Sequence, residues 1–254
     1  MSIITLTTDF GTRDGFVGSM KGVIARLAGD ATVVDISHDV PRHDIAHGAW
    51  VIATTCQEYP HGTIHVAVVD PGVGGARASV IVKVRDQLFV GPDNGLFAYA
   101  AEAGVEGAWL IESAAFRLPD VSPTFHGRDV FAPAAAALAR GRLAATAGRT
   151  AQLVGALPWG PRPIGQGRVV HIDHFGNLIT DLPRGEAGTG AVAIAGMTLP
   201  LVRTYESVAI GQPLAYIGSS GTVEIAVREA RADQVLVAPR GTIVIPAVAS
   251  GPYR

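Results

Sequence analysis

The stretch Ile3-Ile-Thr-Leu-Thr-Thr-Asp-Phe-Gly-Thr-Arg-Asp-Gly15 opens the pattern that decides the fold. Its first residues, 3–7, predict a short buried strand, and residues 9–15 form a polar loop. Residues 16–28 then carry apolar side chains at helical spacing, and residues 32–36 read as a second strand. This order of strand, helix and strand is typical of an α/β domain.

The same alternation continues along the first half of the chain. We expect a third strand at 63–69, a hairpin at 79–84 and 87–90, and helices at 45–55, 95–103 and 130–140. The N-terminal α/β domain, residues 1–157, should therefore contain a largely parallel sheet. Ligands of such sheets bind beyond the carboxyl ends of the strands. Polar clusters at Asp9, 35–39 and Asp70 each follow a predicted strand, where a binding site would need them.

The composition changes at Leu157-Pro-Trp-Gly-Pro-Arg-Pro-Ile-Gly-Gln-Gly167, which holds three prolines and three glycines in eleven residues. Such a segment cannot continue a helix, so we expect a linker over 158–167. Beyond it, short strands alternate with turns and predict a smaller C-terminal all-β barrel domain, residues 168–254. The expected strands are 167–172, 191–194, 197–202, 213–217, 222–227 and 242–245.

Composition restricts the classes of partner and compartment. The 254 residues are 48% hydrophobic and carry a net charge of −2, with basic residues scattered along the chain. We therefore expect no nucleic-acid partner and no membrane surface, and the N-terminal segment does not resemble a signal peptide. The single cysteine, Cys56, leaves no intramolecular disulfide and predicts a small buried side chain. These features favour a soluble cytoplasmic protein.

Two glycine-containing segments carry ionisable side chains that can take part in catalysis. In Asp70-Pro-Gly-Val-Gly-Gly-Ala-Arg77, a carboxylate ends an apolar strand and a guanidinium follows soon after. One interpretation is an ordinary Asp-Pro-Gly turn with Arg77 as a solvated surface charge. The other is that the glycines let the backbone approach a ligand that Asp70 faces.

The second segment is Pro123-Thr-Phe-His-Gly-Arg-Asp129, directly before a predicted helix. Capping by Asp129 and its pairing with Arg128 explain part of this cluster. His126 is better placed for an active site than for a cap. Asp70, Arg77 and His126 together can hold and polarise one water molecule.

Other polar groups have two interpretations each. Asp9 can hold the two hydroxyls of a ribose or serve a turn. The run His171-Ile-Asp-His-Phe-Gly-Asn177 contains two histidines, but its strand-and-turn spacing offers no further ligands, so we expect no metal site. A stacking Phe175 with an amide at Asn177 suits a purine better. Gly218-Ser-Ser-Gly221 is a turn whose paired hydroxyls can bind a carboxylate.

Taken together, these segments resemble the S-adenosyl-L-methionine hydroxide adenosyltransferases, which are relatives of the fluorinase and chlorinase enzymes. The matching pieces, in family order, are Thr7-Thr-Asp-Phe-Gly11, Val33-Val-Asp-Ile-Ser-His38, Val68-Val-Asp-Pro-Gly-Val-Gly74, Arg77, Gly91-Pro-Asp-Asn-Gly95, Pro123-Thr-Phe-His-Gly-Arg-Asp129, Ile172-Asp-His-Phe-Gly-Asn177 and Gly218-Ser-Ser-Gly221. The combination covers nearly the whole chain and is highly specific. The chain departs from the family at Val227-Arg-Glu-Ala-Arg-Ala232, where an Asn-rich turn is common.

The resemblance implies an activity and an assembly. The family converts S-adenosyl-L-methionine and water to adenosine and L-methionine, without a cofactor or a metal. Its members are homotrimers whose active sites lie between the N-terminal domain of one subunit and the C-terminal domain of the next.

The resemblance also implies roles for individual residues. Asp70, Arg77 and His126 match the water-activating triad, and Asp9 matches the residue that holds the ribose hydroxyls. Adenine contacts match Phe175 and Asn177, and positions near the methionine amine and carboxylate match Asp173 and Ser219. We add Ser220, Phe125 and Gly127 to the expected substrate-binding residues.

Three other functions remain open on the sequence. Chlorinase-like halogenation is one, because Gly127 leaves more room than the serine of fluorinases; an anionic Asp70 would, however, repel a desolvated halide. A second is a protein that binds adenosine or S-adenosylmethionine without turnover. The third is a metal-dependent hydrolase that uses the histidines.

Overall fold

The structure is a computed structural model that describes residues 2–248. Contacts divide these residues into two compact units, one that ends at Pro158 and one that begins at Trp159. Residues 249–254 of the predicted second domain lie outside the described residues. No helix among the described residues is both long and apolar enough to cross a membrane.

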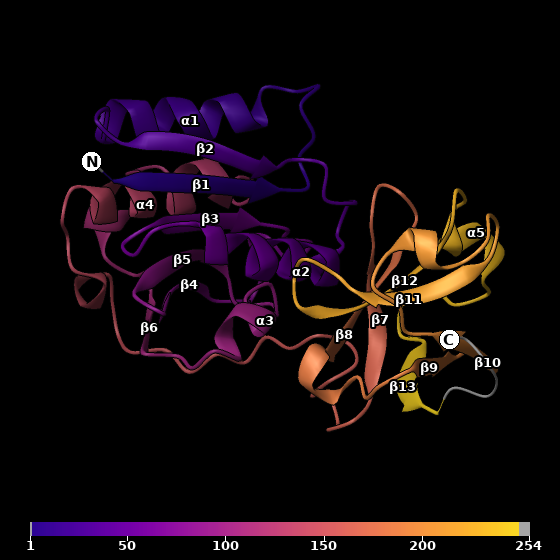
Figure 1. Cartoon of the computed structure of the whole chain (residues 1–254). Coiled ribbons are helices and arrows are strands. Elements are labelled where there is room, and N and C mark those ends of the chain that lie inside the picture. Colours follow the sequence, from indigo (N-terminus) through magenta and orange to yellow (C-terminus); the bar gives the residue numbers. More distant parts are fainter. Residues whose placement is uncertain (1, 249–254) are drawn as a thin grey trace. The chain divides into compact units, whose positions relative to one another are not determined.

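The first unit is built on a six-stranded sheet with the order β2-β1-β3-β5-β4-β6 (Figure 1). The strands are β1 (Ile3–Thr8), β2 (Thr32–Ser37), β3 (Ile64–Val68), β4 (Ser79–Val84), β5 (Gln87–Pro92) and β6 (Gly107–Leu110). Pairing is parallel between β1 and its neighbours β2 and β3, and between β3 and β5, whereas β4 runs antiparallel to β5 and β6. The expectation of a largely parallel sheet is confirmed.

Helices cover both faces of this sheet. They are α1 (Phe16–Leu27), α2 (Ile45–Thr55), α3 (Ala98–Ala101) and α4 (Ala132–Ala139). Successive residues of β3 alternate between two buried clusters: Val66 packs with residues of α1 and α4, and Ala67 with residues of α2. Because β1, β2, β3 and β5 run parallel, the polar residues that follow these strands lie at one edge of the sheet.

Several predicted boundaries are wrong. The helix expected at 95–103 is reduced to α3, because Gly95 has φ +100°, which lies outside the helical region. The helix expected from residue 130 begins at Ala132, after a π-helical turn over Gly127–Phe131. Strand β6 and a strand of the second unit, β8 (Leu178–Pro183), were not predicted; Gly107-Ala-Trp-Leu110 is too short to show a clear alternation.

The second unit is a seven-stranded antiparallel sheet with the order β10-β9-β13-β7-β8-β12-β11. Its elements are β7 (Gly167–Ile172), β8 (Leu178–Pro183), β9 (Ala191–Ile194), β10 (Met197–Pro200), β11 (Pro213–Ile217), β12 (Thr222–Val227), β13 (Ile243–Ala247) and the short helix α5 (Ala232–Val235). Just after β10, Leu201 forms a bridge with Ala215 of β11, and the amide of Val202 donates to the carbonyl of Ala215 over 2.8 Å. The two ends of the sheet therefore meet, as in a barrel. Short 3₁₀ turns occur at Cys56–Glu58, Ala114–Phe116, Ala144–Thr146, Arg184–Glu186 and Tyr205–Ser207.

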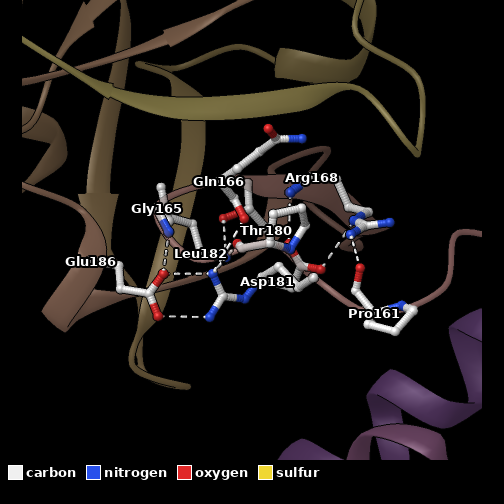
Figure 2. Close-up of polar contacts among 10 residues, drawn as sticks. Pro161, Gly165, Gln166, Arg168, Thr180, Asp181, Leu182 and Glu186 are labelled. Atoms are coloured by element: carbon white, nitrogen blue, oxygen red, sulfur yellow. Dashed lines mark hydrogen bonds and ion pairs between the residues drawn. The ribbon is translucent and has the colours of Figure 1, made fainter.

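Charged side chains fasten the Pro/Gly-rich segment before β7 to the second unit, as Figure 2 shows. Arg168 is 6% exposed and donates to the carbonyl oxygens of Trp159, over 2.7 Å, and Pro161, over 3.1 Å. The Arg162 guanidinium pairs with Glu186, and the resulting hydrogen bonds lower the pKa of Glu186 to about 2. This segment is therefore fixed to the barrel rather than free of it.

Candidate active site

Asp70 and Arg77 form a buried ion pair in the loop between β3 and β4. Nε of Arg77 lies 2.9 Å from Oδ2 and 3.1 Å from Oδ1 of Asp70, and Nη2 also donates to Oδ2. Only 3% of the Asp70 side chain and 11% of the Arg77 side chain are exposed. Arg77 is therefore not a solvated surface charge, and the segment is more than a simple turn.

His126 joins this pair from a distant loop. Nη2 of Arg77 donates to Nδ1 of His126 over 2.7 Å, and Nη1 donates to Oγ of Ser79 over 2.8 Å. The ring of Phe131 lies 5.5 Å from the guanidinium carbon of Arg77. Burial, and then the charge of Arg77, lower the pKa of His126, so its imidazole is neutral near pH 7.

One glycine contact brings the two loops together. Gly74 has φ +74°, and a Cβ placed on it would lie 2.3 Å from the carbonyl oxygen of Pro123. Only glycine therefore allows the loop that carries Asp70 and Arg77 to approach the loop that carries His126.

The Arg128–Asp129 pair organises the loop that carries His126. Asp129 is fully buried, and its Oδ1 accepts from Nε of Arg128 over 2.6 Å. Its Oδ2 accepts from the backbone amide of Ser122 over 2.9 Å, so it fixes the loop rather than the first turn of the helix. The expected pairing with Arg128 is confirmed, and the expected cap is wrong.

Asp9, Phe125 and Gly127 also belong to the first unit. Asp9 directly follows β1, and its Oδ2 accepts from the backbone amide of His43 over 2.9 Å. The ring of Phe125 packs edge-on against Phe10, with centroids 6.1 Å apart. A Cβ on Gly127 would lie 3.2 Å from Sδ of Met20, so any side chain there would push on its neighbours.

The remaining predicted residues lie in the second unit. Asp173 accepts hydrogen bonds from the backbone amide and from Nδ2 of Asn177, each over 2.8 Å. Phe175, 73% exposed, stands beside them on the loop between β7 and β8. Phe175 and Asn177 line a cavity of about 520 Å³, whose other walls are Tyr205, Val227, Glu229, Ala230 and Arg231. The segment that departs from the family pattern therefore forms one side of this cavity.

Ser219 and Ser220 occupy the tight turn between β11 and β12. The carboxyl group of Glu224 lies against this turn, because a Cβ on Gly218 would overlap its Oε1. Oη of Tyr216 donates to Glu224 and lies 2.6 Å from Oη of Tyr205. Burial raises the pKa of Glu224, and the charge of Asp173 acts in the same direction. This network was not predicted, because its residues share no motif in the sequence.

Asp93 and Asn94 serve the architecture of the first unit. The Asp93 carboxylate is 7% exposed and accepts from the backbone amides of Val154 and Gly155, each over 2.9 Å. Nδ2 of Asn94 donates to the carbonyl of Val69 over 2.9 Å. Within residues 2–248, no three His, Cys, Asp or Glu side chains are grouped as a metal site would require.

Comparisons with known proteins agree over most of the chain. Profiles described as the SAM hydroxide adenosyltransferase N-terminal and C-terminal domains match residues 4–148 and 167–245. An (R)-S-adenosyl-L-methionine hydrolase from Salinispora arenicola is 40% identical, over 94% of this chain and 95% of that protein. A fluorinase from an Actinoplanes species is 26% identical, over 88% and 90%.

The fold agrees as well. The crystal structure of an uncharacterized conserved protein from Thermotoga maritima superposes with a TM-score of 0.87 at 31% identity, over 95% of this chain and 99% of that one. With both domain profiles matched in order, this chain belongs to the SAM hydroxide adenosyltransferase family.

Proposed function

We propose that this chain hydrolyses S-adenosyl-L-methionine to adenosine and L-methionine. The observation that carries the proposal is the buried cluster of Asp70, Arg77 and His126, which joins an anion, a cation and a neutral imidazole through short hydrogen bonds. The activity printed for the relative that is 40% identical supports the same reaction. That name also specifies the (R) configuration, and we propose the same preference for the sulfonium centre here.

The reaction needs an activated nucleophile more than an acid. The sulfonium makes methionine a neutral leaving group, whereas hydroxide is scarce at neutral pH. Attack by water at C5′ of the ribose forms a C–O bond and breaks the C–S bond, whose electron pair leaves with sulfur. The water proton must pass to a base.

We assign the base to Asp70 and a donor role to His126. A guanidinium has no acceptor, so Nδ1 of His126 must accept from Arg77, and the imidazole proton lies on Nε2. In that tautomer His126 can donate to the nucleophile but cannot take a proton at Nε2. Asp70 is the remaining Brønsted base of the cluster, and Arg77 stabilises the negative charge that develops.

The other residues divide between recognition of the nucleoside and of the amino acid. We propose that Asp9 binds the ribose hydroxyls, that Phe175 and Asn177 bind adenine, and that Asp173, Ser219 and Ser220 bind the methionine group. Phe125 and Gly127 flank the reacting centre. The homotrimer and the absence of a cofactor are parts of the same proposal.

Halogenation is disfavoured by the charge of the site. A desolvated halide beside the buried Asp70 carboxylate would place two like charges in a low-dielectric environment. Fluorinases are also the more distant relatives, at 26% identity.

The test is product analysis after incubation with each sulfonium epimer in ¹⁸O-labelled water, with and without excess chloride and with and without a chelator. Adenosine labelled at the 5′-hydroxyl, formed faster from the (R) epimer and unaffected by the chelator, is the expected result. A 5′-chloro nucleoside, loss of activity in the chelator, or no product at all would each overturn the proposal. The Asp70→Asn variant is the control for contaminating activity, because it should form no product.

A further inference from the structure

A set of hydrogen bonds around Asp9 begins at two residues to which the proposed reaction gives no role, Thr8 and His38. Nδ1 of His38 lies 2.9 Å from Oγ1 of Thr8, and the same Oγ1 accepts from the amide of Phe10 over 3.2 Å. The carbonyl of His38 accepts from the amide of Gly11 over 2.8 Å. Side chain and backbone of His38 thus reach both ends of the turn that presents Asp9.

His38 is itself held from the other side. Its Nε2 lies 3.0 Å from Oδ1 of Asp35, whose Oδ2 pairs with Nζ of Lys21 over 2.6 Å. His38 is 6% exposed, and Thr8 is fully buried. Although burial acts in the opposite direction, hydrogen bonds from Lys21 and His38 hold the pKa of Asp35 below its ordinary value. These contacts connect α1 and β2 to the end of β1, where Thr8 precedes Asp9.

A second contact between a threonine and a histidine occurs in the same sheet and serves as a comparison for Thr8 and His38. Oγ1 of Thr5 lies 2.8 Å from Nδ1 of His65, and both residues are buried. This pair lies within the paired part of β1 and β3, and the His65 ring stacks on Phe89 at 5.0 Å. The two pairs share their chemistry, but only Thr8 and His38 contact the turn at the carboxyl end of β1.

We infer that Thr8 and His38 are positioning residues for ribose recognition, which act by fixing the turn that carries Asp9. A carboxylate can bind a vicinal diol with high discrimination only if its oxygens are held before the ligand arrives. Within the described residues, Oδ2 of Asp9 is engaged by the amide of His43 and no hydrogen bond reaches Oδ1. The inference rests on the proposed role of Asp9 in the hydrolase.

The test compares adenosine with 2′-deoxyadenosine by calorimetry on the full-length protein. Thr8→Val removes the hydroxyl and keeps the shape; Thr5→Val is its matched control on the same strand. We expect the wild-type protein to bind adenosine about 10- to 100-fold more tightly than the deoxynucleoside. In Thr8→Val this ratio should fall at least about five-fold, whereas affinity for 2′-deoxyadenosine should change less than about two-fold.

His38→Asn and His38→Phe extend the test. Asn keeps a polar atom near the position of Nδ1 and should restore much of the ratio, whereas Phe keeps the volume and should lose it. An unchanged ratio in both Thr8→Val and His38→Phe, or an equal fall in Thr5→Val, would overturn the inference. Failure of the wild-type protein to bind adenosine, or to discriminate at all, would instead overturn the role proposed for Asp9.

Discussion

Nη2 of Arg77 and Nδ1 of His126 lie 2.7 Å apart although 49 positions separate them in the sequence. Because the guanidinium can only donate, this contact fixes the imidazole tautomer with its proton on Nε2. It also makes Arg77 the centre of the site, bonded to the base on one side and to the histidine on the other.

The tautomer predicts different effects for two substitutions of His126. Gln places an amide near the position of Nε2 and can still donate there, whereas Asn replaces only Nδ1. We expect kcat of His126→Gln to stay within about ten-fold of the wild-type value and kcat of His126→Asn to fall by about 10²- to 10⁴-fold. Steady-state kinetics with saturating S-adenosylmethionine measures both. Equally large losses would show that the imidazole itself takes the proton.

Activity should depend on the neutral form of His126. Burial and the charge of Arg77 lower the pKa of this group from its ordinary value of 6.5. A proton on Nδ1 would break the bond from Arg77, so kcat/KM should decline as the pH falls through the lowered pKa. The acidic limb should therefore lie below pH 6.5, and its position should change in His126→Gln, which removes the imidazole. A limb above that pH in the wild-type protein would contradict the neutral imidazole.

Gly74 offers a test of the contact between loops. In Gly74→Ala the new methyl group meets the carbonyl of Pro123 at 2.3 Å, so the loops must separate and Arg77 must move from His126. We expect kcat to fall more than about ten-fold, since small misplacements of catalytic groups are costly. Gly62 has φ +81°, and a methyl group there would meet no atom within 4 Å, so Gly62→Ala is the matched control for backbone strain alone. Similar values of kcat in the two variants would show that the contact between Gly74 and Pro123 is not needed for catalysis.

Much of the first unit was predictable because its strands and helices show strong local patterns. Residues 3–7 and 63–69 are apolar runs, and polar groups follow them where parallel strands end. The segments that carry Asp70 and His126 stand out for their glycines and ionisable groups. The correct predictions are therefore those that depend on residues close together in the sequence.

The rest depends on contacts that no local pattern encodes. Nothing near Gly74 indicates that it touches Pro123, and nothing near Thr8 indicates that its hydroxyl meets His38. The π-helical turn at Gly127–Phe131 is compatible with an ordinary helix in its sequence, and the deviation accompanies the burial of Asp129. Such features form only when distant loops pack together. The sequence therefore indicates which residues belong to the site, but not the distances and contacts between them.

Asp93 should matter for stability rather than for turnover. Its carboxylate accepts hydrogen bonds from the backbone amides of Val154 and Gly155, which lie near the end of the first unit at Pro158. Asp93→Ala would remove the charged acceptor of both amides, and we expect the free energy of unfolding to fall by about 2 to 4 kcal/mol. Urea titration measures this change, with the exposed Asp30→Ala as control. Loss of kcat in the folded variant, without loss of stability, would place Asp93 in the active site instead.

Phe175 should contribute binding energy without contributing to the fold. Its side chain is 73% exposed at the edge of the cavity of about 520 Å³, so Phe175→Ala should change the free energy of unfolding by less than about 0.5 kcal/mol. Stacking on a base is worth about 1 to 3 kcal/mol, so Phe175→Ala should raise the Kd for adenosine by about 5- to 150-fold.

The control for the removal of apolar surface is Ile210→Ala, at a side chain that is 64% exposed. Calorimetry with adenosine and with ribose separates the contributions, because a residue that stacks on the base should leave ribose binding unchanged. An unchanged Kd for adenosine in Phe175→Ala would show that adenine does not bind in this cavity.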